Sequence, residues 1–134
     1  MSFPSSQFRK FSVLAARSAD GKKAMDIRLL DLKRTHGALS DYLLILSANS
    51  QVHMKALRDT IEQSLEQLGI SLLHQDGTRG SQWIALDYGG LLVHIFHEEA
   101  REFYSLERLW PEASDVRWNE THRKSKAKAI RKRN

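Results

Sequence analysis

Residues 83–110 read WIALDYGGLLVHIFHEEAREFYSLERLW, and this stretch decides the fold. It begins with two β-rich segments, 83–87 and 91–96, which lie on either side of Gly89 and Gly90. A two-residue Gly-Gly turn suits the positive φ values that a tight hairpin demands. The sequence therefore predicts an antiparallel hairpin at the start of this stretch.

Alternation along the two strands divides their side chains between two faces. In the register set by a two-residue turn, Asp87 lies opposite Leu92. One face predicts a core and carries Ile84, Leu86, Tyr88, Leu91, Val93 and Ile95. The other face mixes aromatic, acidic and apolar side chains, namely Trp83, Ala85, Asp87, Leu92, His94 and Phe96. Such a face is typical of one that a helix covers in part and a partner contacts in part. The alternative is that Trp83 packs beneath the first helix and His94 is hydrogen-bonded internally.

The chain before the hairpin contains strand and helix patterns. Residues 25–31 and 42–47 are short apolar runs that predict two strands. An amphipathic helix is predicted next, with Ser50 as its N-cap and Gly69 at its C-terminal end. Its apolar stripe consists of Met54, Leu57, Ile61, Leu65 and Leu68. Residues 70–73 predict a short strand, and residues 74–82, HQDGTRGSQ, predict a loop.

A helix is expected at each end of the domain. Residues 98–110 predict a last helix that Pro111 ends. On that helix Phe103, Leu106, Leu109 and Trp110 are expected near one side. At the other end of the chain Phe8, Phe11, Leu14 and Ala15 recur at helical spacing and are expected to cover the sheet. The first nineteen residues contain three basic side chains and no acid, which is also typical of an organellar transit peptide. We favour the helix, because the apolar spacing supports it.

Charge is distributed unevenly along the 134 residues. Residues 117–134 hold eight of the 21 Lys and Arg and one of the 16 acids, so residues 1–116 hold thirteen basic and fifteen acidic side chains. The sequence thus predicts one domain over 1–116 with net charge −2 and a basic, disordered tail over 117–134 with net charge +7. The tail residues suited to RNA phosphates are Arg123, Lys124, Lys126, Lys128, Arg131, Lys132 and Arg133. A solubilising end without a specific role is the alternative.

Composition and motifs exclude several classes of function. The absence of cysteine excludes disulfides, thiolate metal sites and thiolate catalysis. No run approaches the roughly 18 apolar residues of a membrane span. His94 and His97 would point to opposite faces of a strand, and no third ligand stands at a useful spacing, so a metal site is not predicted. The paired acids of phosphoryl transfer and the glycine-rich phosphate loops are also missing. We therefore expect a binding protein with no catalytic residues and no cofactor.

Five segments resemble, in order and spacing, the Iojap family of ribosomal silencing factors. They are 26–32 (DIRLLDL), 41–50 (DYLLILSANS), 53–59 (HMKALRD), 82–88 (QWIALDY) and 91–110 (LLVHIFHEEAREFYSLERLW). The resemblance covers roughly residues 8–113. Two departures are visible, because SANS stands where the family usually has a glycine in its second place, and Gly90 stands where an acid usually follows DYG.

The resemblance implies a fold and a function. The fold is a single α/β domain with a mixed β-sheet flanked by helices, similar to the nucleotidyltransferase fold without its active site. The function is binding to the large ribosomal subunit, at large-subunit ribosomal protein fourteen, which blocks association with the small subunit and represses translation when nutrients are limited. A cytoplasmic location, a homodimer and contact of the tail with rRNA are further expectations.

Interface energetics are dominated by aromatic and arginine side chains, and acids suit a basic partner. The residues expected at the partner are Trp83, Asp87, Tyr88, His94, His97, Glu98, Arg101, Tyr104, Leu109 and Trp110. A general RNA-binding protein that acts through the basic tail is the alternative function.

Overall fold

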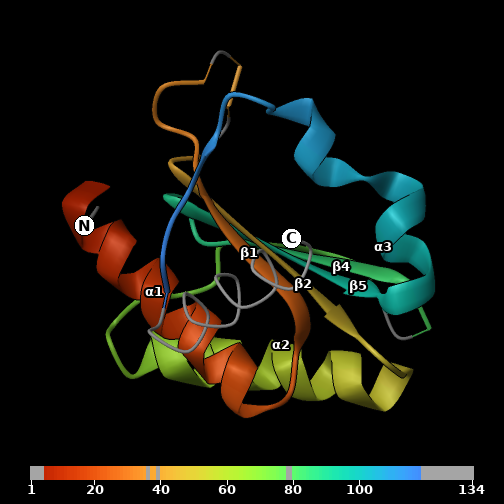
Figure 1. The fold of residues 1–134 in the computed structure, drawn as a ribbon. Coiled ribbons are helices and arrows are strands. Elements are labelled where there is room, and N and C mark those ends of the chain that lie inside the picture. The colour runs from red at the N-terminus through yellow and green to blue at the C-terminus, as the bar shows by residue number, and fades with distance from the viewer. Residues whose placement is uncertain (1–4, 36, 39, 78–79, 119–134) are drawn as a thin grey trace, which may run out of the picture.

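The computed structural model describes residues 5–35, 37–38, 40–77 and 80–118. These residues form a mixed six-stranded sheet with the order β3-β4-β5-β2-β1-β6 and helices on both faces (Figure 1). The elements are α1 (Ser5–Gly21), β1 (Met25–Asp31), β2 (Tyr42–Ala48), α2 (Gln51–Glu66), β3 (His74–Asp76), β4 (Trp83–Asp87), β5 (Leu91–His97), α3 (Glu98–Tyr104), the 3-10 helix η1 (Leu106–Leu109) and β6 (Ser114–Asp115). The predicted α/β fold is confirmed. None of the described helices is long and apolar enough to cross a membrane.

Parallel pairing of β2 with β5 forms the centre of the sheet. All seven residues of β2 are buried. β1 pairs antiparallel with β2 on one side, and β4 pairs antiparallel with β5 on the other. Asp87 lies opposite Leu92, so the register predicted from the Gly-Gly turn is confirmed. β2 and β5 each extend one residue beyond their predicted ends.

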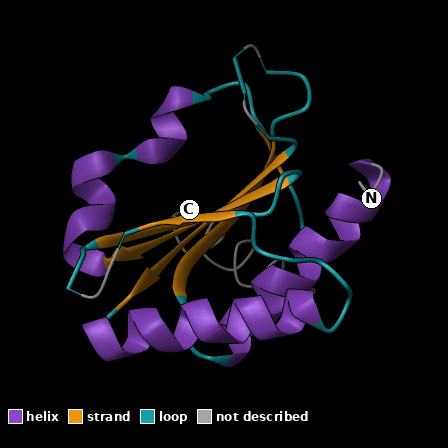
Figure 2. Ribbon diagram, turned by 180° about the vertical axis from the view of Figure 1, so that it is seen from behind, coloured by secondary structure: helices purple, strands orange, loops and turns teal. Residues whose placement is uncertain are grey.

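Two hydrophobic cores lie on the two faces of the sheet. Figure 2 shows α1 and α2 on one side, and α3 with η1 on the other. The larger core, beneath α1 and α2, contains all six residues that alternation assigned to the buried face of the hairpin. The smaller core includes Phe96 and Leu106, and Trp83 packs against it. Trp83 therefore lies on the α3 side, and the alternative that placed it beneath the first helix is wrong.

The predicted helix after β2 is confirmed as α2. Ser50 is its N-cap, and its Oγ accepts a hydrogen bond from His53 N at 3.0 Å. The first four residues of the predicted stripe are buried, whereas Leu68 lies beyond the helix end and is 40% exposed. Gly69 has a φ of +83°, so the chain turns there through the left-handed conformation as predicted.

The N-terminal segment is α1, which packs against α2 and the sheet. Phe8 and Ala15 are buried as predicted, but Leu14 is 39% exposed. Ala16 and Ala19 are buried in its place. Small side chains lie on the covered face of α1, and they allow the helix to approach α2 closely.

Two segments between α2 and the C-terminus differ from prediction. The strand expected at 70–73 is absent among the described residues, and β3 lies at 74–76, where a loop was expected. The reason is Gly77, with a φ of +93°, where an added Cβ would lie 2.4 Å from the carbonyl oxygen of Trp83. This close approach brings 74–76 into pairing with β4. β6 was not predicted, and it pairs with the end of β1.

The segment after β5 is not one helix, as predicted, but two short ones. Ser105 separates α3 from η1 and adopts the left-handed conformation with a φ of 42°. The change of direction separates side chains that were expected near one side of a single helix, because Leu106 is buried while two of the others are exposed. Phe103 is 82% exposed and Leu109 is 65% exposed.

The described chain ends within the larger core. Val116 and Trp118 are both buried there. Trp118 lies two residues beyond the expected domain boundary at 116. The tail residues expected to contact RNA lie in 119–134, outside the described residues.

Phe8 and Gly90 are in direct contact, and this contact can be tested. A Cβ at Gly90 would lie 2.4 Å from Cγ of Phe8, so the ring of Phe8 fills the space that any larger residue at position 90 would need. We expect Gly90→Ala to lower the free energy of unfolding by about 1 to 3 kcal/mol through overpacking. Phe8→Ala should lower it by about 3 kcal/mol or more. In the double variant the Gly90→Ala cost should disappear, as measured by urea denaturation of all four proteins.

Additive costs in this cycle would contradict the contact. A coupling energy below about 0.5 kcal/mol would place Phe8 away from the hairpin turn. A coupling energy above this value would also explain why a glycine, and not an acid, follows Tyr88 and Gly89 in this chain, because the ring of Phe8 occupies the space that a side chain would need.

Candidate protein-docking site

The site is built on α3, which starts directly where β5 ends. His97 is the N-cap, and its Nδ1 accepts a hydrogen bond from Glu99 N at 3.2 Å. Glu98 and Glu99 occupy the first turn, where carboxylates interact favourably with the helix dipole. Glu98 is exposed and free to face a partner, whereas the ring of His97 holds the helix start.

Arg101 anchors α3 to the sheet. It is 9% exposed, and its guanidinium donates to Ser47 Oγ at 2.8 Å and to Glu107 Oε1 at 3.4 Å. Burial lowers the pKa of Arg101, and the carboxylate of Glu107 opposes that shift. Because Glu107 belongs to η1, one side chain ties both short helices to β2. Arg101 was expected at the partner, but this burial gives it a positioning role.

Trp83 and His94 form a neighbouring pair on the second face of the hairpin. Trp83 Nε1 donates to His94 Nδ1 at 2.8 Å, so His94 is hydrogen-bonded internally as one interpretation predicted. Burial lowers the pKa of His94 from 6.5 to about 4, which keeps Nδ1 unprotonated and able to accept. The ring of Trp83 stacks on Phe96 with centroids 5.0 Å apart. It also contacts Tyr104, at 4.9 Å.

The outer layer of the site is the α3–η1 surface, defined here as Phe103, Tyr104, Leu109 and Trp110. Phe103 is 82%, Tyr104 48% and Leu109 65% exposed, and they are three of the seven large hydrophobic residues exposed in the described chain. Phe103 meets Tyr104 edge to face at 5.2 Å. Trp110 is partly buried and packs against the smaller core. Large aromatic side chains on a firmly supported layer are typical of protein interfaces.

Asp87 and Tyr88 lie apart from the start of α3, at the turn end of the hairpin. Asp87 Oδ1 accepts a hydrogen bond from Gly89 N at 2.8 Å and so stabilises the turn. Tyr88 is 3% exposed and faces α2, as strand parity predicted. Burial, with a smaller contribution from Glu62, raises its pKa to about 12. The geometry therefore separates Tyr88 from the α3–η1 surface.

The chemistry of the site suits binding. No group of three or more His, Asp or Glu side chains that could hold a metal ion occurs in the described part of the chain. The polar side chains at the site have structural roles: His97 caps α3, Arg101 anchors it, and His94 accepts the hydrogen bond from Trp83. Phe103 was missed as a surface residue, because its spacing from Leu106 favoured burial on a continuous helix.

Comparison with known proteins gives a consistent family. The sequence model described as "Ribosomal silencing factor during starvation" matches residues 5–134. The ribosomal silencing factor RsfS of Bacillus subtilis is 34% identical over 100 residues, covering 75% of this chain and 84% of the relative. The chloroplastic protein Iojap of Zea mays is 31% identical over 109 residues, covering 79% of this chain and 46% of that protein. A crystal structure from Bacillus halodurans has a TM-score of 0.69 and 30% identity, covering 81% of this chain and 99% of that one.

Protonation of His94 should destabilise the domain. Its folded pKa of about 4 lies below the ordinary 6.5, so the unfolded chain binds a proton first as pH falls. The stabilisation is complete above pH 6.5 and is lost towards pH 4, by up to about 3 kcal/mol. His94→Asn keeps an acceptor near the position of Nδ1 but does not titrate. We expect urea denaturation between these pH values to show a flatter pH dependence for the variant, whereas parallel curves would contradict the assignment.

Proposed function

Because the chain belongs to the family of ribosomal silencing factors, we propose that it binds the large ribosomal subunit at ribosomal protein fourteen and blocks joining of the small subunit. Translation would thereby be repressed when nutrients are limited. The role requires no catalytic residue and no cofactor, and we propose that it is carried out in the cytoplasm.

The observation that supports this proposal is the α3–η1 surface. Its exposed aromatic and aliphatic side chains are of the kind that provide most of the binding energy in protein interfaces. Exposed acids lie on the same segment, namely Glu98, Glu99, Glu102 and Glu112. Exposed apolar and acidic side chains on one segment complement a basic ribosomal protein, because opposite charges guide the encounter and apolar burial retains the complex.

Silencing by steric exclusion needs a rigid obstacle, and the anchoring of α3 provides one. α3 has only seven residues, too few for a helix to be stable by itself. Its cap at His97 and its anchor at Arg101 fix it on β2 and β5. A partner bound at α3 is therefore coupled to the whole sheet and to the helices behind it.

Removing the outermost side chains of the α3–η1 surface should weaken docking without unfolding the protein. We expect Phe103→Ala together with Leu109→Ala to weaken binding to purified ribosomal protein fourteen by about thirtyfold, which corresponds to about 2 kcal/mol. The variant should also fail to keep isolated subunits apart in a light-scattering assay. Because both residues are more than 60% exposed, the melting temperature should stay within a few degrees of the parent.

Val52→Ala together with Leu73→Ala is the matched control. These residues are 81% and 68% exposed and lie outside the α3–η1 surface. The control should bind and silence like the parent. If both double variants bound ribosomal protein fourteen equally well, docking would use another surface. If the parent protein left subunit joining unchanged at saturating concentration, the silencing proposal itself would be wrong.

The tail is predicted to add affinity without choosing the partner. Truncation should follow Trp118, because that side chain is buried and its removal would disturb the core. We expect the truncated protein to bind the isolated ribosomal protein like the parent, but to bind large subunits with a weaker dependence on salt. Loss of binding to both would instead favour the alternative, a general RNA-binding protein that acts through the tail.

A further inference from the structure

A basic surface lies on α1 and the turn that follows it. Arg9, Lys10, Arg17, Lys22 and Lys23 are all exposed, whereas Asp20 is the one acid in the described residues 5–23. The segment therefore carries a net charge of +4. Lys10 and Arg17 are seven residues apart, so they share one side of the helix and are separated by about 10 Å along its axis. We name these five basic residues the α1 basic surface.

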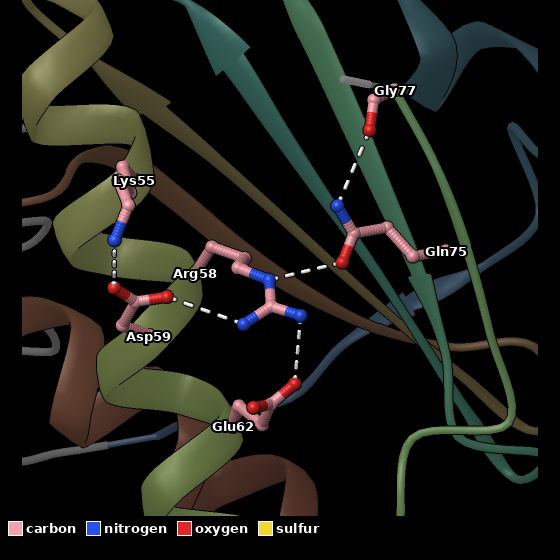
Figure 3. A network of polar contacts seen from close by, with 6 residues as sticks. All are labelled: Lys55, Arg58, Asp59, Glu62, Gln75 and Gly77. Atoms are coloured by element: carbon pink, nitrogen blue, oxygen red, sulfur yellow. Dashed lines mark hydrogen bonds and ion pairs between the residues drawn. The ribbon is translucent and has the colours of Figure 1, made fainter. Parts of the chain in front are cut away.

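The basic side chains on one face of the neighbouring helix α2 form ion pairs within the domain. Lys55 pairs with Asp59 at 2.7 Å, and Arg58 pairs with Asp59 at 3.2 Å and with Glu62 at 2.8 Å (Figure 3). Arg58 Nε also donates to Gln75 Oε1 at 3.0 Å, which ties α2 to β3. The charges on this face of α2 are thus satisfied inside the domain.

The basic residues of the α1 basic surface differ from those of α2 in this respect. Within the described part of the chain, no carboxylate forms an ion pair with any residue of the α1 basic surface. The positive charges therefore do not stabilise the fold through ion pairs, and they raise its electrostatic energy by mutual repulsion. An anionic partner would relieve this repulsion.

The same surface receives the start of the basic tail. Arg17 Nε donates to the carbonyl oxygen of Trp118 at 2.6 Å, and the Trp118 side chain is buried in the core that α1 covers. The C-terminal segment in Figure 1 runs from η1 past β1 to α1. Residues 119–134, with seven basic side chains and one acid, thus follow directly from a point beside α1.

We propose that the α1 basic surface binds the phosphate backbone of RNA. A double helix carries one phosphate charge per roughly 1.7 Å of its axis, so cations spaced along α1 can each meet phosphates and release counterions. Phe8, Ala15, Ala16 and Ala19 of α1 are buried in the core and Leu14 is its one large exposed apolar residue among the described residues, whereas a helix that inserts into a membrane needs a broad free apolar face. The charge and shape of α1 therefore favour RNA over a lipid surface.

This RNA contact would leave the α3–η1 surface open. α1 lies on the opposite side of the sheet from α3 (Figure 2), so the two surfaces can be occupied together. The inference does not depend on the docking proposal, because it concerns a different partner on a different face.

The test measures binding of the full chain to a fluorescently labelled 20-base-pair RNA duplex. Fluorescence anisotropy gives the affinity at KCl concentrations from 50 to 300 mM. We compare the parent with Arg9→Gln together with Lys10→Gln. The matched control, Arg34→Gln together with Lys55→Gln, removes the same charge from exposed residues elsewhere. We expect the α1 variant to weaken binding about fivefold or more and to lower the salt slope by about 2, because two phosphate contacts are lost. The control should change affinity less than twofold.

Three results would overturn the proposal. An α1 variant with the parent's affinity and slope would assign RNA binding to the tail alone. Equal loss of RNA affinity in both variants would show that only the net charge of the protein matters. Binding of the parent to anionic phosphatidylglycerol vesicles but not to the duplex would assign the surface to a membrane. Capture of the α1 variant by purified ribosomal protein fourteen is measured in parallel, so loss of RNA binding and failure of docking are distinguished.

Discussion

Seven residues of β2 pair in parallel with seven of β5, from Tyr42 opposite Leu91 to Ala48 opposite His97, and this pairing positions every other element. Parallel neighbours need a crossover connection, and α2 lies within it. Side chains alternate between the faces, so a slip of one residue would exchange the contents of the two cores. Both strands also end at the same edge of the sheet. Ser50 caps α2 there and His97 caps α3, so one pairing places a helix on each face.

The candidate docking site depends on that edge for its geometry. Ser47 of β2 lies close enough to α3 for the buried guanidinium of Arg101 to reach it, and Glu107 accepts from the same group. A buried charge needs partners of this kind, because an unpaired one would cost several kcal/mol. The anchor thus turns two short helices into a fixed support for Phe103 and Leu109. An interface of modest size then requires little ordering of its own on binding.

Elements with a periodic side-chain pattern could be predicted from the sequence, whereas features that depend on one residue or one tertiary contact could not. The hairpin register and α2 were predicted correctly, because strand alternation and the apolar stripe recur over many residues, and the Gly-Gly turn and the Ser50 cap agree with those patterns locally. The break at Ser105 rests on a single residue with a φ of 42° and on the Arg101 anchor, which is a tertiary contact. Helical spacing therefore grouped Phe103 with Leu106 on one side of a continuous helix, whereas Phe103 is exposed and Leu106 is buried. β3 depends in the same way on one close approach at Gly77, which a local pattern that favours a loop does not reveal.

The two faces of the domain carry different chemistry, and this difference bears on how the protein could hold a ribosomal subunit. The segment of the α3–η1 surface carries exposed apolar and acidic side chains, whereas the α1 basic surface is cationic. Since the sheet separates them, contacts on one face do not compete with contacts on the other. A protein docked through α3 would hold α1 at high effective concentration near any RNA within reach. Weak phosphate contacts would then lengthen the lifetime of the complex with the subunit without a larger docking interface. Added salt would weaken these phosphate contacts but not the apolar contact.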